Sequence, residues 1–169
     1  MTQAVLEREA EAVERTKDAP KTLRVCFVCT GNTCRSPMAE AVANALAKKA
    51  GKSLEAFSAG LYAAEGEPIS LHSVLALENA EVPVVEGHDY HKHTAHTLGD
   101  EAETFDLLVG LEKNHAMELL MRFPQLASRV VCMPESIADP YGGSLAVYEE
   151  SLEQITKGVK ELLFAGESI

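Results

Sequence analysis

Short apolar runs recur along the chain and predict strands. Residues 23–28, 105–111 and 129–133 are each largely apolar, and residues 54–57 form a shorter run of the same kind. Runs of this length are typical of strands that are buried on both faces of a parallel sheet. We therefore predict four strands, all of them buried.

Between these runs, apolar residues recur at the three- and four-residue spacing of helices. This spacing predicts helices at 37–50, 71–80, 98–103, 114–123 and 144–164. Pro37 suits a first helical turn, Gly51 ends the first helix, and Ser70 can cap the second. Strands that alternate with helices predict an α/β fold, with helices on both faces of a parallel sheet.

Length and composition predict one domain after a charged leader. A chain of 169 residues with 46% hydrophobic residues is large enough to bury a single core. Residues 1–21 carry charges throughout and form either a short surface helix or a disordered segment, of which we favour the second. Residues 22–169 are predicted to form the single domain.

The charge of the chain limits its partners. A net charge of −11 disfavours nucleic acid, because binding to phosphates needs a basic surface. No apolar run reaches the length of a membrane span, and the N-terminus lacks the apolar stretch of a secretion signal. We expect a cytoplasmic protein that binds neither nucleic acid nor membranes, and its oligomeric state stays open.

The most informative segment is the loop between the first strand and the first helix, which reads Cys-Thr-Gly-Asn-Thr-Cys-Arg-Ser at 29–36. Such a loop turns its backbone N–H groups inward, and the helix that follows adds the positive end of its dipole. Because this environment favours an anion, we predict that it lowers the pKa of the Cys29 thiol. Arg35 offers paired donors for phosphate oxygens. Ser36 can donate a hydrogen bond to the thiolate or serve only as a helix cap, and the two roles are compatible.

A carboxylate late in the chain completes the predicted chemistry. Asp139-Pro140 follows the last predicted strand, and parallel strands present their carboxyl ends at one edge of the sheet. Cys29 would attack phosphorus in line, while Arg35 and the loop amides hold the equatorial oxygens. Asp139 would protonate the leaving atom and then activate water. Taken alone, Asp139-Pro140 is better interpreted as a plain turn, because Asp-Pro is ordinary in turns.

Together these residues resemble the low-molecular-weight protein tyrosine phosphatase family. The match consists of Cys-x5-Arg-Ser at 29–36, the Pro-Met-Ala-Glu that follows it, and Asp139-Pro140, and it covers residues 23–164. The resemblance implies a flavodoxin-like fold with a four-stranded parallel sheet, a phosphocysteine intermediate and phosphorylated proteins as substrates. It implies no metal and no cofactor.

The resemblance also assigns supporting and binding roles. Asn32 matches the residue that holds the turn of the loop, and Ser58 and His93 match positions that support it. It suggests that Cys34 forms a disulfide with Cys29 under oxidation, although Cys34 is equally well interpreted as a small buried residue. The loop residues expected to bind substrate are Thr30, Gly31, Asn32, Thr33, Cys34 and Ser36.

Two features are similar to the bacterial protein-arginine phosphatases of this family. Thr33 stands where tyrosine phosphatases usually carry Ile, and Gly-Gly follows Tyr141 where they often place a second aromatic residue. A hydroxyl can order a polar guanidinium or a water, whereas Ile suits an aromatic ring. Tyr62 and Tyr141 are predicted to form the walls of the pocket. We therefore predict a phosphatase that hydrolyses protein phosphoarginine, with phosphotyrosine as the alternative substrate.

Three other functions are less well supported. Arsenate reductases of similar fold need further redox cysteines, and no Cys lies between Cys34 and Cys132. A non-catalytic phosphate-binding module would be expected to lack the nucleophile or the acid. A zinc site would need ligands beyond Cys26 and Cys29, so Cys26 and Cys132 are most simply core residues. The segment 88–96 contains four histidines. We interpret it as a solvated loop with one structural His.

Overall fold

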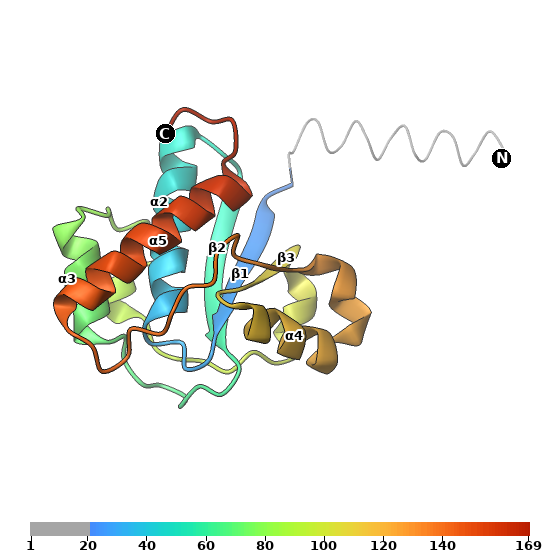
Figure 1. The fold of residues 1–169 in the computed structure, drawn as a ribbon. Coiled ribbons are helices and arrows are strands. Elements are labelled where there is room, and N and C mark those ends of the chain that lie inside the picture. The colour runs from blue at the N-terminus through green and yellow to red at the C-terminus, as the bar shows by residue number, and fades with distance from the viewer. Residues whose placement is uncertain (1–20) are drawn as a thin grey trace, which may run out of the picture.

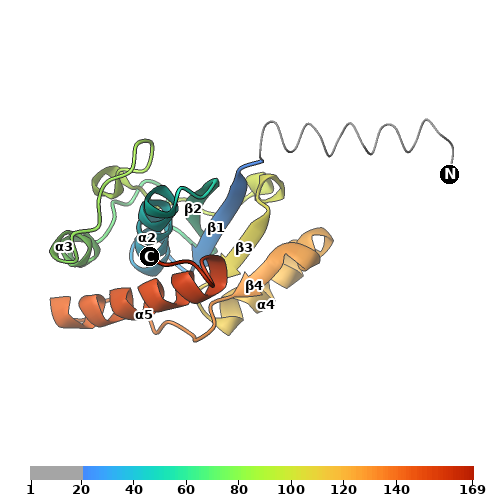
Figure 2. The same ribbon diagram turned by 90° about the horizontal axis from the view of Figure 1, so that it is seen from above.

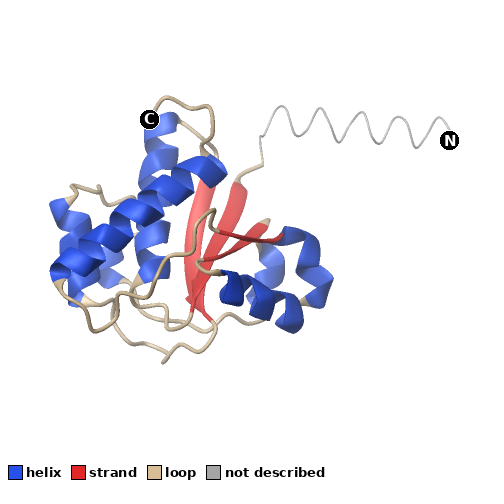
Figure 3. Ribbon diagram, in the orientation of Figure 1, coloured by secondary structure: helices blue, strands red, loops and turns tan. Residues whose placement is uncertain are grey.

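The computed structural model describes residues 21–169, which fold around a four-stranded parallel sheet (Figures 1 and 3). The strands are β1 (Leu23–Cys29), β2 (Leu54–Gly60), β3 (Leu107–Gly110) and β4 (Val130–Cys132), in the order β2-β1-β3-β4. All three pairings are parallel, as in a flavodoxin-like fold. The predicted fold class is confirmed. The charged leader expected at residues 1–21 lies outside the described part of the chain, apart from Lys21.

Helices cover both faces of the sheet. The α-helices are α2 (Arg35–Ala50), α3 (Leu71–Asn79), α4 (Lys113–Arg122) and α5 (Leu145–Leu163). The 3₁₀ helices are η1 (Tyr90–Lys92), η2 (Asp100–Thr104) and η3 (Pro124–Arg129). Helix α5 lies across α2 in both views of the ribbon (Figures 1 and 2). Within residues 21–169, no helix has both the length and the apolar character that a membrane span requires.

The central strand β1 separates two apolar clusters. Val25 and Phe27 pack with side chains of α2, α3 and α5 on one face. Cys26 and Val28 pack with side chains of α4, η2 and η3 on the other face. All four side chains are almost fully buried, because successive side chains of a strand point to opposite faces and both faces are covered.

The structure corrects the sequence prediction at β2, at α2 and at the 3₁₀ helices. Strand β2 continues to Gly60 instead of ending at 57, because every residue of β1 finds a partner along it. This pairing outweighs the low strand preference of Ala and Gly. Helix α2 begins at Arg35 instead of 37, with the backbone N–H of Met38 bonded to the Cys34 carbonyl. The helix predicted at 98–103 is the 3₁₀ helix η2, and η1 and η3 were not predicted.

The carboxyl ends of all four strands meet at one edge of the sheet. The loop 29–36 leaves β1 there, Gly60 ends β2, and Glu112 follows β3. The segment after β4 crosses back over this edge, where the Ile137 N–H bonds the Leu111 carbonyl. The topology therefore collects four separate pieces of chain around the loop that carries Cys29.

Gly60 is where β2 passes closest to this loop. A Cβ at Gly60 would lie 2.6 Å from the Thr30 carbonyl oxygen and 3.2 Å from the Asn32 Cβ. The Gly60→Ala variant is expected to lose about 1–3 kcal/mol of unfolding free energy, because backbone has to move to admit the methyl group. Urea denaturation measures the loss. Gly31→Ala is the control, because a Cβ at Gly31 meets nothing within 4 Å, and an equal loss in both variants would contradict the prediction.

Candidate active site

Asn32 turns the loop between β1 and α2. It is fully buried and has φ 58°, in the left-handed region that few residues other than Gly and Asn adopt. Its backbone N–H points back to the Cys29 sulfur at 3.3 Å, and its carbonyl accepts a hydrogen bond from His93 Nε2 at 2.9 Å. The hydrogen bonds of the Asn32 backbone N–H and carbonyl therefore hold the turn in place.

The Asn32 side chain uses all of its hydrogen-bonding groups. Its Nδ2 donates to Ser36 Oγ at 2.8 Å and to Ser58 Oγ at 3.1 Å, and its Oδ1 accepts from the backbone N–H of His96 at 3.0 Å. Because a backbone N–H can only donate, the orientation of the amide is fixed. Ser58 and His93 thus contact Asn32 from β2 and from the segment after η1.

Ser36 links the side chain of Asn32 to the sulfur of Cys29. Ser36 Oγ accepts from Asn32 and lies 2.9 Å from the Cys29 sulfur, so its own hydrogen is free to donate to a thiolate. Ser36 lies inside α2, whose N-cap is Cys34, so the alternative that Ser36 caps the helix is excluded.

The pKa of Cys29 differs from the prediction. Burial raises the pKa of this thiol above its ordinary value, while the Ser36 hydrogen bonds and the charge of Arg35 lower it by less. Cys29 is only 3% exposed. The expectation of a lowered pKa is therefore wrong for the net shift, because burial outweighs the favourable contacts.

Arg35 is buried and already holds two partners. Its Nη1 donates to Glu112 Oε2 and to the carbonyl of Ile137, both at 2.8 Å. Asp139 Oδ2 lies 3.8 Å from the other terminal nitrogen, Nη2. Because the two hydrogens of Nη1 are occupied, the edge formed by Nε and Nη2 is the one left to grip an oxyanion.

The loop, Asp139 and Tyr141 enclose a cavity of about 190 Å³, whose loop residues run from 29 to 35. The predicted nucleophile, clamp and acid therefore meet at one place. Asp139 is half-exposed, and its Oδ1 accepts a hydrogen bond from the backbone N–H of Tyr141 at 3.1 Å.

Tyr62 does not line this cavity, so the prediction that it forms a wall of the pocket is corrected. Its ring lies over the guanidinium of Arg122, 4.5 Å away, because Arg122 also holds the Leu61 carbonyl.

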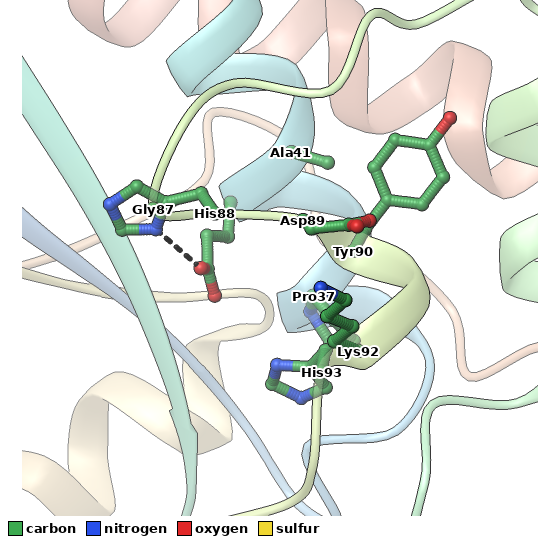
Figure 4. A pocket seen from close by; sticks show the side chains of 9 residues that line it. Pro37, Ala41, Gly87, His88, Asp89, Tyr90, Lys92 and His93 are labelled. Carbon is green, nitrogen blue, oxygen red and sulfur yellow. Dashed lines mark hydrogen bonds and ion pairs between the residues drawn. The ribbon is translucent and has the colours of Figure 1, made fainter.

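A second cavity, of about 410 Å³, adjoins the residues that support Asn32 (Figure 4). Ser58 Oγ donates to Glu40 Oε1 at 2.5 Å, and the other oxygen of Glu40 accepts from His88 Nδ1 at 2.9 Å. His88 and His93 both line this cavity, and the dashed line in Figure 4 marks the bond from His88. A chain of hydrogen bonds therefore runs from Asn32 through Ser58 and Glu40 to His88.

The histidine-rich segment is more ordered than predicted. Besides His93, three histidines each bridge two carboxylates: His88 contacts Glu40 and Glu55, His91 contacts Asp89 and Glu78, and His96 contacts Glu65 and Glu101. The expectation of one structural His is therefore wrong. Asp89 and Glu101 lie close in sequence to their histidines, whereas the other four acidic partners come from more distant parts of the chain, so the sequence pattern did not reveal the bridges.

Two residues that the sequence prediction missed complete the site. Glu112 and His115 belong to the start of α4 and form a capping box there. Glu112 contacts Arg35, and His115 Nε2 lies 3.1 Å from Thr30 Oγ1. Their only sequence signal is that they follow directly on the buried strand β3, at the edge where sites of such sheets lie.

The cysteines are all free thiols. Cys26 is buried, as predicted for a core residue, whereas Cys132 is only partly buried. The Cys34 sulfur lies 3.3 Å from the hydroxyl of Tyr148 on α5. Both Cys29 and Cys34 line the cavity of about 190 Å³, and the suggested disulfide between them stays a prediction.

Comparison with known proteins assigns the family. Residues 24–169 match the model of the family described as low molecular weight phosphotyrosine protein phosphatase. The chain belongs to this family. It is a cysteine-based protein phosphatase, a hydrolase whose substrates are phosphorylated proteins. Membership of this family explains both the strand order β2-β1-β3-β4 and the Cys-x5-Arg loop at the edge of the sheet.

Relatives of this phosphatase are named either protein-arginine-phosphatase or protein-tyrosine-phosphatase. The protein-arginine-phosphatase of Bacillus subtilis is 30% identical over 146 residues, covering 82% of this chain and 93% of the relative. The probable low molecular weight protein-tyrosine-phosphatase EpsP of Ralstonia nicotianae is 35% identical over 140 residues, covering 80% and 90%. The relatives therefore agree on the phosphatase and differ in the phosphorylated residue.

Solved structures show the same division. The low molecular weight protein tyrosine phosphatase from T. tengcongensis superposes with a TM-score of 0.76 at 36% identity, covering 84% of this chain and 98% of that one. The YwlE arginine phosphatase from Geobacillus stearothermophilus superposes with a TM-score of 0.72 at 29% identity, covering 83% and 90%. The fold of the phosphatase is thus common to both groups.

Removing the Ser36 hydroxyl tests its role at the thiol. Because the Ser36 hydrogen bonds lower the pKa of Cys29, the Ser36→Ala variant is expected to shift the pH midpoint of Cys29 alkylation upwards. The rate of iodoacetamide labelling at Cys29, followed by peptide mass spectrometry across pH, measures this midpoint. Ser151→Ala removes a buried serine of α5 and is the control. A midpoint that stays constant or falls in Ser36→Ala would contradict the prediction.

His88 is expected to make the stability depend on pH. Its hydrogen bond to Glu40, with a further one to Glu55, raises its pKa from 6.5 to about 8. Since the folded pKa exceeds the unfolded one, this stabilisation is complete below the unfolded pKa and is lost as pH rises through about 8. Melting temperatures should therefore fall more steeply over this range in wild type than in His88→Gln. Parallel curves for the two proteins would show that His88 contributes nothing.

Proposed function

We propose that this phosphatase hydrolyses phosphoarginine in proteins through a phosphocysteine at Cys29. The observation that carries the substrate assignment is the polar lining of the catalytic cavity. Thr33 and Asp139 offer a hydroxyl and a carboxylate, and among residues 21–169 the single aromatic residue that lines it is Tyr141, 78% exposed. A guanidinium can bond to both polar groups, whereas a phenyl ring would have little to stack on.

The first step forms the bond between sulfur and phosphorus. The Cys29 thiolate attacks phosphorus, the bond from phosphorus to the guanidine nitrogen breaks, and Asp139 gives its proton to that nitrogen. The loop amides and the Nε–Nη2 edge of Arg35 hold the equatorial oxygens, where charge is spread in the transition state. Ser36 stabilises the thiolate before the attack. Support comes from a solved mutant of YwlE arginine phosphatase that carries a phosphorylated active-site serine.

The second step returns the free enzyme. Asp139, now a carboxylate, takes a proton from water as the water attacks phosphorus. The bond between phosphorus and the Cys29 sulfur breaks, so inorganic phosphate and the thiolate are released. The half-exposed position of Asp139, 3.8 Å from Arg35, suits a group that meets both the leaving nitrogen and the entering water.

Phosphotyrosine is the second candidate substrate. The exposed ring of Tyr141 at the mouth of the cavity gives an aromatic substrate one surface to pack against. Several relatives of similar identity are named tyrosine phosphatases. The proposal for phosphoarginine therefore depends on Thr33 and Asp139 outweighing this single aromatic contact.

Two peptides that differ only in the phosphorylated residue test the assignment. Wild type is expected to have the higher kcat/KM for phosphoarginine, because the polar lining contacts its guanidinium. Thr33→Ile should shift the ratio of the two kcat/KM values towards phosphotyrosine by about 10-fold or more. Thr33→Ser, which keeps the hydroxyl, is the matched control. A wild type that prefers phosphotyrosine would overturn the phosphoarginine assignment.

The nucleophile is tested separately from the substrate. Cys29→Ser is expected to abolish turnover of both peptides, because a serine hydroxyl is far less nucleophilic than a thiolate at neutral pH. Turnover is measured as phosphate release, and binding of the phosphopeptides shows that the variant remains folded. Activity near the wild-type level would contradict the phosphocysteine mechanism.

A further inference from the structure

His115 is a buried histidine beside the catalytic loop, and it has no role in the phosphoryl transfer proposed for Cys29 and Asp139. It is the third residue of α4 and is only 1% exposed. Its ring lies between the backbone N–H of Glu112, 3.1 Å from Nδ1, and the hydroxyl of Thr30, 3.1 Å from Nε2. The ring therefore joins the start of α4 to the second residue of the catalytic loop.

The contacts of His115 fix its tautomer. A backbone N–H can only donate, so Nδ1 must present a lone pair to the N–H of Glu112. The ring hydrogen then stands on Nε2 and is donated to Thr30 Oγ1. Burial and the nearby charge of Arg35 lower the pKa of His115, which keeps this neutral form at neutral pH.

The start of α4 holds the ring in place. A Cβ at Gly110 would lie 3.0 Å from the His115 Cβ and 2.7 Å from the backbone nitrogen of Ala116, so only a glycine allows the helix to pack this closely on β3. Glu112, which caps the same helix, is bonded to Arg35. One helix start therefore touches two residues of the catalytic loop, Arg35 and Thr30.

The Thr30 hydroxyl is left with a hydrogen to donate. Its oxygen accepts from His115 Nε2, and among residues 21–169 this ring nitrogen is the one hydrogen-bond partner of the hydroxyl. Thr30 is exposed and lines the catalytic cavity beside Cys29. With Nε2 of His115 fixed as a donor, the hydroxyl hydrogen has to turn away from the ring.

We propose that His115 is a positioning residue that fixes the Thr30 hydroxyl as a donor to a phosphoryl oxygen in the cavity. Thr30 adds a side-chain contact to those of the loop amides and Arg35, and His115 acts through Thr30 without touching the substrate. The inference rests on phosphoryl transfer at Cys29, and it is independent of which amino acid carries the phosphate.

Thr30 is tested first, with p-nitrophenyl phosphate as substrate and inorganic phosphate as competing ligand. Thr30→Val keeps the shape of the side chain and removes the hydroxyl. It is expected to lower kcat/KM about 10- to 100-fold, as for loss of a hydrogen bond to a charged group, and to weaken inhibition by phosphate. Thr30→Ser keeps the hydroxyl and should recover most of the activity. A Thr30→Val enzyme with wild-type kcat/KM would overturn the proposal.

A double-mutant cycle then tests whether His115 acts through Thr30. His115→Gln should lower kcat/KM in the wild-type background and have little further effect in Thr30→Val, because the hydroxyl that it positions is already gone. Losses that multiply independently would show that His115 has only a structural role. Melting temperatures of the four proteins separate lost stability from lost activity.

The tautomer provides a readout that needs no variant. Nitrogen-15 NMR of the wild-type protein is expected to show His115 protonated at Nε2 and unprotonated at Nδ1 at neutral pH. A doubly protonated ring, or a hydrogen on Nδ1, would overturn the proposal even if the His115 variant did not fold. Because p-nitrophenyl phosphate contains neither arginine nor tyrosine, failure here is distinguishable from failure of the phosphoarginine assignment.

Discussion

The hydrogen bonds of one buried amide, that of Asn32, hold the catalytic loop in shape. A left-handed backbone costs about 1–2 kcal/mol at most residues, and Asn tolerates it because its short side chain can bond locally. Here the side chain bonds to Ser36, Ser58 and the backbone of His96, and the main-chain carbonyl accepts from His93. The turn in the loop thus depends on contacts from β2, α2 and the segment after η1.

This arrangement also explains why the sheet order matters to the chemistry. The loop lies on the central strand β1, with β2 on one side and β3 on the other. Strand β2 brings Ser58 to Asn32, and the end of β3 brings Glu112 to Arg35 and His115 to Thr30. The crossing segment after β4 adds Asp139. Each neighbour of the loop therefore supplies a contact that orders one of its residues.

Much of the fold and part of the site could be predicted from sequence. Buried strands are continuous apolar runs, so the sheet was recognisable, and Cys29, Arg35 and Asp139 lie where motif and topology predict. The net pKa shift of Cys29 was not predictable, because it depends on how completely α2 and the sheet exclude water from the thiol. Glu112 and His115 carry no motif, and their contacts arise only when β3 pairs beside β1.

A covalent intermediate at Cys29 is the central claim of the proposed mechanism. Rapid acid quenching of wild type during turnover of a phosphoarginine peptide, followed by peptide mass spectrometry, would locate the transferred phosphoryl group. We predict that the peptide containing Cys29 gains the mass of one phosphoryl group during turnover and loses it once substrate is exhausted. Phosphate release without a phosphorylated Cys29, or a phosphoryl group on another residue, would contradict the role of the loop as a cradle for a phosphocysteine.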